Sequence, residues 1–231
     1  IGLWVLLASI IDFFPGPLEV AGSMIREIAT GGLALHFVVS LYRIGLGMGF
    51  ALALGIPTGL LLGLNKSLDD LISPIIYVIY PLPKIVFLPV ILLLLGIGDA
   101  SKVFLIWIIV FFQIVVSTRD AVRSIDLSTI KSVESLGAGI FQVCRHVILP
   151  AALPAILTSL RITIGTAVAV LFFVESFATR EGLGYFIMDA WARIDYVRMF
   201  AGIVAMGVLG YGLYKAIDLV ERRACEWTRY T

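Results

Sequence analysis

The sequence predicts an all-α membrane protein with about six transmembrane helices, and three observations support this fold class. Of the 231 residues, 60% are hydrophobic and only 14% are charged. With a mean hydropathy of +1.05, the chain has more apolar surface than the single core of a soluble protein could bury. The apolar residues also gather in long runs that short polar turns separate. We therefore expect the chain to lie in a lipid bilayer.

Six apolar runs are interpreted as spans, and one further segment is amphipathic. The expected spans cover residues 1–14, 33–64, 71–95, 102–118, 150–175 and 199–220. The first is taken as the end of a helix rather than a signal peptide, because it has no charged n-region and no A-x-A site before Pro15. Residues 18–32 place apolar side chains on one face, which predicts either a helix at the membrane interface or an ordinary loop helix.

Small residues and prolines distinguish two of the spans. Ala51, Gly55, Gly59 and Gly63 recur every four residues, a spacing that lets another helix approach closely. The span 71–95 is interrupted by Pro74, Pro81, Pro83 and Pro89. Since backbone carbonyls freed by proline cannot face lipid, we expect this span to line a cavity or to pack against other helices.

The distribution of positive charge orients the chain. Six spans put both termini on one side, and that side carries more of the Lys and Arg residues. The positive-inside rule then makes both termini and the polar loop at about 119–149 cytoplasmic, and makes the segment at about 176–198 periplasmic. No internal repeat or linker divides residues 1–231, so we expect a single transmembrane domain in a multi-pass protein of the plasma (inner) membrane.

Several function classes are disfavoured by the residues present. The net charge is +1 with acids and bases interleaved, which gives no basic stripe for nucleic acid. Residues 59–67 are the nearest match to a phosphate loop, but they insert two residues between the second glycine and Lys66. His36 and His146 are too isolated to form a metal site. We expect no catalytic residue, no metal and no enzyme activity in this chain.

The polar loop is expected to contain two short helices. Asp126 or Ser128 can cap a first helix that runs to about Leu136. Gly137 follows it and is the residue type that ends a helix in the left-handed conformation.

The second short helix is expected over residues 140–147, at an angle to the first, with a stop at Leu149-Pro150 before the fifth span. Its residues Phe141, Cys144 and Arg145 share one face. An exposed aromatic ring beside a cation suits insertion into a groove of a partner protein. The alternative is that this face packs against the membrane ends of the protein itself.

This loop resembles the cytoplasmic coupling loop of permease subunits of binding-protein-dependent type I ABC importers. The family pattern is EAA, three residues, Gly, nine residues and I-x-L-P. Gly137 stands at the glycine of this pattern, Val147 at the isoleucine and Leu149-Pro150 at the terminal pair, with the spacing intact. The departure is Lys131-Ser132-Val133 in place of EAA, which leaves Glu134 as the substitute for the acidic residue.

Further segments extend the resemblance over nearly the whole chain. Those similar to the branch that imports nitrate, sulfonates and taurine are FPGPLEV (14–20), PLP (81–83), LP (88–89), GIG (96–98), SK (101–102) and EGLGY (181–185). The resemblance implies a small, anionic cargo of this kind, delivered by a periplasmic or extracellular binding protein. An unrelated cargo such as a vitamin precursor is the alternative within the family.

The resemblance also implies the partners. They are a second permease subunit, expected to be another copy of this chain, two cytoplasmic ABC ATPase subunits that bind ATP and Mg, and an extracytoplasmic solute-binding protein. No cofactor is expected in this chain itself. The residues that the resemblance assigns to ATPase coupling are Glu134, Ser135, Leu136, Gly137, Ala138, Phe141, Gln142, Arg145, Val147, Leu149 and Pro150.

Ionisable residues within the spans are the candidates for a pathway or gate. Lys84, Arg161 and Glu175 lie in expected spans, where a charge must face a partner or a wet cavity. Pairing within the protein is the alternative for each. The candidates for docking of the binding protein, by resemblance, are Glu181, Gly182, Leu183, Gly184 and Tyr185.

A rival function from another class is an ion-coupled secondary transporter that works alone. Such a protein needs a polar site near the bilayer midplane, on broken helices in repeated halves. The broken third span qualifies, but no matching repeat accompanies it.

Overall fold

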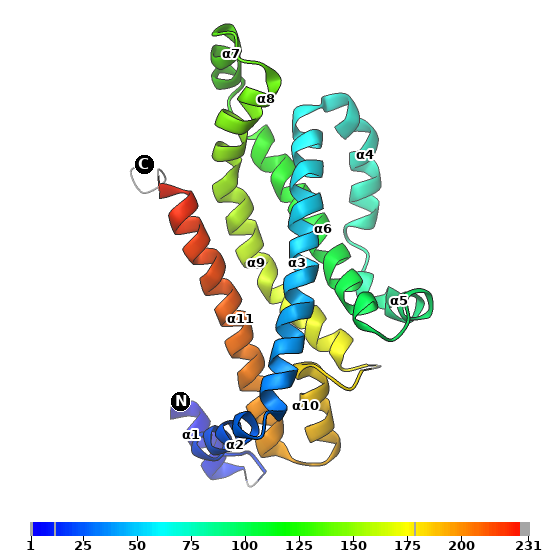
Figure 1. Cartoon of the computed structure of the whole chain (residues 1–231), viewed down its shortest axis with the longest axis vertical. Helices are drawn as coiled ribbons and strands as arrows, with labels where there is room; N and C mark the ends of the chain where they lie inside the picture. The colour runs from blue at the N-terminus through cyan, green and yellow to red at the C-terminus, as the bar shows by residue number, and fades with distance from the viewer. Residues whose placement is uncertain (1, 12, 178, 227–231) are drawn as a thin grey trace. The chain divides into compact units, whose positions relative to one another are not determined.

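The computed structural model describes residues 2–11, 13–177 and 179–226, and this part of the chain is helical without strands (Figure 1). The longer elements are α1 (Gly2–Ile10), α2 (Pro17–Ala29), α3 (Gly32–Leu64), α4 (Lys66–Ile79), α5 (Leu88–Leu95), α6 (Asp99–Arg123), α7 (Leu127–Ser135), α9 (Leu149–Glu175), α10 (Leu183–Ala192) and α11 (Tyr196–Ala224). The shorter elements are the 3₁₀ turn η1 (Lys84–Phe87), α8 (Ile140–Val143) and the π turn η2 (Cys144–Ile148).

The helices confirm the all-α membrane fold class. Within the described residues, four helices are long and apolar enough to cross a membrane, namely Gly32–Leu64, Asp99–Arg123, Ile140–Glu175 and Tyr196–Ala224. A fifth span results if the pair Lys66–Ile79 and Lys84–Leu95, bent by 77° at its break, is counted as one.

The expected first span, residues 1–14, corresponds to α1, which at nine residues is shorter than the roughly 20 residues that a span needs. Residues 1 and 12 of that span lie outside the described residues.

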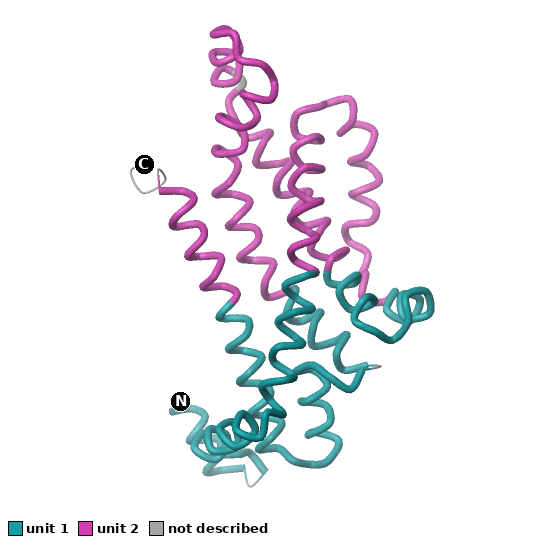
Figure 2. Tube along the Cα trace, in the orientation of Figure 1, with its two compact units in different colours: residues 1–46, 87–106, 167–212 teal, residues 47–86, 107–166, 213–231 magenta. Residues whose placement is uncertain are grey.

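Internal contacts divide the chain into two units (Figure 2). Unit 1 comprises residues 1–46, 87–106 and 167–212, and unit 2 comprises residues 47–86, 107–166 and 213–231. The helices α3, α6, α9 and α11 each contribute residues to both units.

In unit 1, α2 forms where the amphipathic segment predicts a helix. The Gly16 N–H donates to Glu19 Oε2 at its start. Val20 is buried, whereas Leu18 and Ile25 expose 87% and 69% of their surface. Apolar side chains that the protein leaves uncovered suit a helix at the membrane interface.

In unit 2, the small residues of α3 allow close contact with α6, as their four-residue spacing predicts. A Cβ atom added at Gly59 would lie 2.5 Å from the Cβ of Thr118, and one added at Gly63 would lie 2.6 Å from that of Val122. At Gly55, an added Cβ atom would lie 2.9 Å from the Cγ2 of Ile114. A larger side chain at these positions would force the two helices apart.

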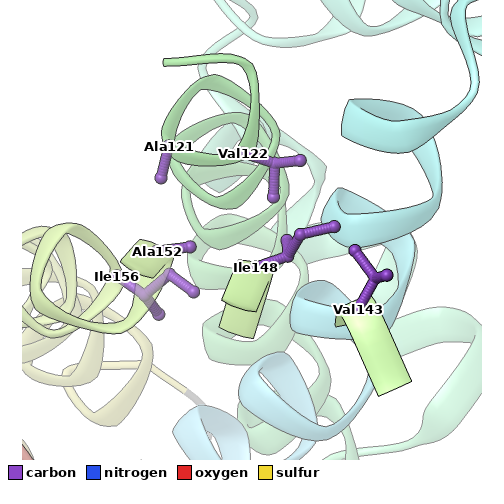
Figure 3. Close-up of a cluster of buried hydrophobic side chains, with 6 residues drawn as sticks. All are labelled: Ala121, Val122, Val143, Ile148, Ala152 and Ile156. Carbon is purple, nitrogen blue, oxygen red and sulfur yellow. The ribbon is translucent and has the colours of Figure 1, made fainter. Parts of the chain in front are cut away.

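The same face of α6 continues into a buried apolar cluster with the start of α9 (Figure 3). Its side chains come from α6, from α8 and η2, and from α9. They are Ala121, Val122, Val143, Ile148, Ala152 and Ile156. The cluster therefore fixes the polar loop, which leaves α6 and returns through α8, to the two helices that flank it.

Candidate functional site

The polar loop begins with a capped helix, as its sequence predicts. Asp126 is the N-cap of α7, and its Oδ1 accepts a hydrogen bond of 2.9 Å from the Ser128 N–H. That bond lowers the pKa of the Asp126 carboxyl below its ordinary value of 3.8. Gly137 follows the helix with φ of +86°, the left-handed conformation expected of it.

The second helix of the loop differs from the prediction. It does not stop at Leu149-Pro150, because α8, the π turn η2 and α9 form one continuous helix from Ile140 to Glu175. At the π turn, the Leu149 N–H donates to the carbonyl of Cys144, five residues back. We attribute the continuity to this wider turn, since Pro150 comes directly after it and has no N–H to place in a regular ladder.

The first residues of the expected loop are helical. Arg119 and Asp120 still belong to α6, which extends to Arg123, so the segment between the long helices starts at Ser124. Arg119 is buried rather than presented to a partner.

The loop exposes three large apolar side chains. Leu136, Ile140 and Phe141 expose 86%, 67% and 73% of their surface. Directly after them, Val143 is fully buried in the cluster of Figure 3. The loop thus has one side anchored on the protein and another that no other part of the described chain covers.

The remaining predicted coupling residues divide between these two sides. Gln142 is exposed, and its Oε1 accepts the Gly139 N–H at the start of α8. Ala138 and Val147 pack against the buried cluster. The exposed residues are Glu134, Ser135 and Arg145, and the half-buried ones are Leu149 and Pro150.

A buried ionic cluster supports the loop from within unit 2, and the sequence did not reveal it. Arg119 lies 3.5 Å from Asp69 of α4, donates to Ser73 Oγ over 2.7 Å and donates to the Tyr77 hydroxyl over 2.7 Å. Arg123 contacts the other oxygen of Asp69 at 2.6 Å. The available signal was the four-residue spacing of Asp69, Ser73 and Tyr77, which places them on one face of α4.

In unit 1, Glu175 is fully buried and is held by three donors. Arg43 Nη1 contacts its Oε1 at 2.9 Å, and Ser40 and the Gly184 N–H donate to its Oε2 over 2.7 and 3.0 Å. Arg43 also contacts the half-exposed Asp99 at 2.7 Å. The structure therefore gives the predicted pathway candidate Glu175 a partner inside the protein.

The segment EGLGY is tied to the same cluster through its backbone. Arg43 donates to the carbonyl of Glu181, the Gly182 N–H donates to His36 Nδ1, and the Leu183 N–H donates to Ser40 Oγ. Residues 182–184 are buried, whereas Glu181 is exposed and Tyr185 is half-buried. Among the predicted docking residues, only Glu181 and Tyr185 retain side chains that a partner can reach.

The other two pathway candidates also have partners within unit 2. Lys84 donates to the Tyr80 carbonyl over 2.9 Å and lies 5.0 Å from the ring centre of Phe112. Arg161 pairs with Glu221 and lies over the ring of Tyr214.

No metal site is formed by the described residues, because none of their His, Cys, Asp and Glu side chains make a suitable group of three or more.

Comparison with known proteins shows which family this chain belongs to. The sequence profile of the family described as "Binding-protein-dependent transport system inner membrane component" matches residues 55–224. The taurine transport system permease protein TauC of Escherichia coli (strain K12) is 33% identical over 220 residues, which are 93% of this chain and 80% of that protein. The nitrate import permease protein NrtB of Synechocystis sp. is 29% identical over 192 residues, which are 82% of this chain and 69% of that protein.

Solved structures agree on the fold. A chain of the MetNI methionine ABC transporter, in an inward facing conformation, matches with a TM-score of 0.71 at 22% identity, over 86% of this chain and 98% of that chain. At this identity the likeness shows the fold alone. Taken with the family match, it shows that the chain is a membrane permease of the binding-protein-dependent transport system inner membrane component family, a transport subunit of ABC importers.

Proposed function

We propose that this chain builds the translocation pathway together with a second copy of itself, and that two cytoplasmic ATPase subunits drive the pair. ATP and Mg are bound by those ATPases and not by this chain. A separate binding protein delivers the solute from outside. In this arrangement the C-terminal end of α11 and the α7–α8 segment face the cytoplasm, and α10 faces the binding protein.

The observation that carries the proposal is the exposed apolar face of the loop, formed by Leu136, Ile140 and Phe141. Large apolar side chains that gather on a water-facing loop mark a contact site for a partner, and burying each one contributes about 1.5–3 kcal/mol. The family places the ATPase contact at this loop. We therefore assign Leu136, Ile140 and Phe141 to a groove of the ATPase subunit.

Movement of the ATPase would reach the spans through the anchored side of the loop. Val143 and Ile148 pack against α6 and α9 in the cluster of Figure 3. The glycines of α3 lie in close contact with α6. A push on α7 and α8 is thus transmitted to a tightly packed set of helices in unit 2, as a two-state rearrangement requires.

The solute class follows from the relatives. The names of TauC and NrtB assign them taurine and nitrate. We propose a small sulfonate-like or nitrate-like solute for this chain, with most of the selectivity supplied by the binding protein.

The test uses the assembled transporter in proteoliposomes, with its ATPases and its solute-loaded binding protein. In the variant Leu136→Ala/Phe141→Ala, we expect the stimulation of ATP hydrolysis by the binding protein to fall by roughly tenfold or more, because two apolar anchors are lost. The matched control is Leu93→Ala, a leucine of α5 that is 85% exposed but lies outside the loop. Undiminished stimulation in the double variant would overturn the assignment of the loop.

A further inference from the structure

The ionic cluster around Arg119 joins the end of α6 to α4 within unit 2. Arg119 lies four residues before the end of α6 at Arg123, and the polar loop starts directly after that residue. The two carboxylate oxygens of Asp69, near the start of α4, contact Arg119 at 3.5 Å and Arg123 at 2.6 Å. A displacement of the loop would therefore reach α4 through the last turn of α6.

Helix α4 buries few of its own residues, and most of these are polar. They are Asp69, Ser73 and Ile76, and the other side chains of α4 are half-buried or exposed. The Ser73 hydroxyl accepts a hydrogen bond from Arg119 and donates one to Asp69. Buried polar contacts of this kind can specify one register between two helices where apolar contacts alone would allow several. Arg119 therefore largely sets how α4 lies against α6.

The same guanidinium reaches the far end of α4. Its Nη2 donates to the Tyr77 hydroxyl over 2.7 Å, and its Cζ lies 5.3 Å from the centre of that ring. Helix α4 ends two residues later, at Ile79, and Pro81 and Pro83 interrupt the span beyond it. Because proline has no N–H, carbonyls of the preceding turn lose their helical donors, and such a break must face protein or water rather than lipid. Arg119 thus links the helix end that carries the loop to the break in this span.

A cavity of about 670 Å³ lies beside this break, with walls from α6 and α9. Tyr80, directly after α4, and Asp120 of α6 both line it. The Oδ1 of Asp120 accepts two hydrogen bonds from Arg119, of 2.9 and 2.8 Å. A shift of α4 along α6 would therefore change the distance between Tyr80 and Asp120, and with it the shape of the cavity.

We propose that Arg119 is a positioning residue for transport, which couples the loop end of α6 to α4 so that a displacement of the polar loop alters the broken span and the cavity beside it. Arg119 is buried, so it acts through Asp69, Tyr77 and Asp120. A contiguous set of hydrogen bonds carries coupling when the helices that it joins shift between two discrete arrangements. This inference rests on the proposed function and deepens it, because it names the side chain through which motion driven by ATP reaches the pathway.

The test follows both ends of this connection with nitroxide labels, in the complete transporter with its ATPases and its binding protein. Both native cysteines are replaced by serine. One label is placed at Ser132→Cys, exposed on α7, and another, in a separate variant, at Val78→Cys, exposed in the last turn of α4. Spectra are recorded without nucleotide and with Mg-ATP and vanadate, which traps the ATPases. In Arg119→Met, we expect the spectral change at Ser132→Cys to remain and the change at Val78→Cys to be lost.

The Arg119→Met variant leaves no buried charge unpaired. Asp69 keeps Arg123 at 2.6 Å, and Asp120 is 57% exposed, so water can replace its lost donor. The cluster therefore loses the connection to Tyr77 without the cost of an isolated buried carboxylate.

A milder variant keeps the test valid if Arg119→Met fails to assemble. Tyr77→Phe removes only the hydroxyl that accepts from Arg119. It should reduce the change at Val78→Cys by roughly twofold or more, because a hydrogen bond to a charged group is lost. The matched control is Tyr214→Phe, which should leave that change intact. The Tyr214 ring also lies beside an arginine, Arg161, but its hydroxyl has no partner among the described residues.

The outcomes separate this inference from the proposed function. An undiminished change at Val78→Cys in Arg119→Met would overturn the inference. Loss of the change at both labels would overturn it as well, because Arg119 would then have a structural role in the loop itself. With Arg119 intact, a change at Ser132→Cys without one at Val78→Cys would also contradict it. If neither label responds to ATP and vanadate while Arg119 is intact, the loop does not follow the ATPases, and the proposed function is overturned together with this inference.

Discussion

Two segments that connect long helices carry family motifs, and they differ in how far the rest of the protein buries them. The loop of α7 and α8 leaves Leu136 and Phe141 exposed and contacts the rest of unit 2 mainly through Val143 and Ile148. In contrast, the EGLGY segment after α9 is held in unit 1 through its backbone, and residues 182–184 are buried.

The difference shows that a motif can mark either a contact with another protein or a set of buried contacts that holds a segment within the chain. In the first loop, the side chains of the motif point outward and its glycine sets the turn. In the second segment, the glycines make room for Glu175: a Cβ atom added at Gly182 would lie within 2.6 Å of its carboxylate, and one added at Gly184 would lie 2.6 Å from its Cβ atom. Substitutions should therefore affect function in the first loop and stability in the second segment.

The largest effect is expected from removing the buried ion pair between Arg43 and Glu175. In Arg43→Ala, the fully buried Glu175 loses its cation, and removing one member of a buried pair costs about 3–5 kcal/mol in the free energy of unfolding. Unfolding by SDS in mixed micelles measures this loss. Asp99→Asn, at the half-exposed partner, should cost far less. A cost under about 1 kcal/mol for Arg43→Ala would show that the pair of Arg43 and Glu175 is not what holds the EGLGY segment.

A smaller effect is expected at Gly184. A Cβ atom there would lie 2.6 Å from both the Cβ of Glu175 and the carbonyl oxygen of Phe172, so Gly184→Ala should destabilise the protein by about 1–3 kcal/mol. The control is Gly165→Ala within α9, where nothing lies within 4 Å of the added atom. That change should be neutral or stabilising by about 0.5–1 kcal/mol. Equal thermal midpoints for the two variants would contradict the proposed packing.

In the coupling loop, Gly137→Ala should act mainly on function. The space around Gly137 is empty, but its φ of +86° costs an alanine about 1–2 kcal/mol, which the loop can relieve by changing its turn. We expect a nearly unchanged thermal midpoint of the whole protein and weaker stimulation of ATP hydrolysis by the binding protein. Gly139→Ala, at a position with φ of −73° and open space, is the control. Matching stimulation in both variants would show that the turn at Gly137 is not needed.

Features set by neighbouring residues were predictable from the sequence. The four-residue spacing of Gly55, Gly59 and Gly63 predicted the close contact that they make with α6. The cap at Asp126 and the left-handed turn at Gly137 follow from preferences that act within a few residues.

Features that depend on distant pairing were not predictable in this way. Arg43 and Glu175 are 132 positions apart, and nothing in the local pattern of either residue names the other. The charge of Arg119 favours a place in the polar loop, whereas Asp69, Ser73 and Tyr77 on α4 make its burial possible. The stop predicted at Pro150 is wrong because a π turn precedes this residue, and Ile148 of that turn packs in the buried cluster with residues of α6 and α9.

The smallest effect is expected at Asp126, whose substitution tests whether α7 depends on local contacts alone. In Asp126→Ala, the Ser128 N–H loses its acceptor, so amide hydrogen exchange should become faster over residues 128–131 and stay unchanged in α9. Asp126→Asn keeps a side-chain oxygen and should exchange more slowly than the alanine variant. The Asp126 carboxylate is charged at neutral pH, and because its pKa is lowered in the folded protein, the stabilisation by this cap is lost only as the pH falls below the ordinary value of 3.8. If the change at Asp126 also accelerated exchange in the buried part of α9, α7 would be coupled to the helix bundle more tightly than its exposed face suggests.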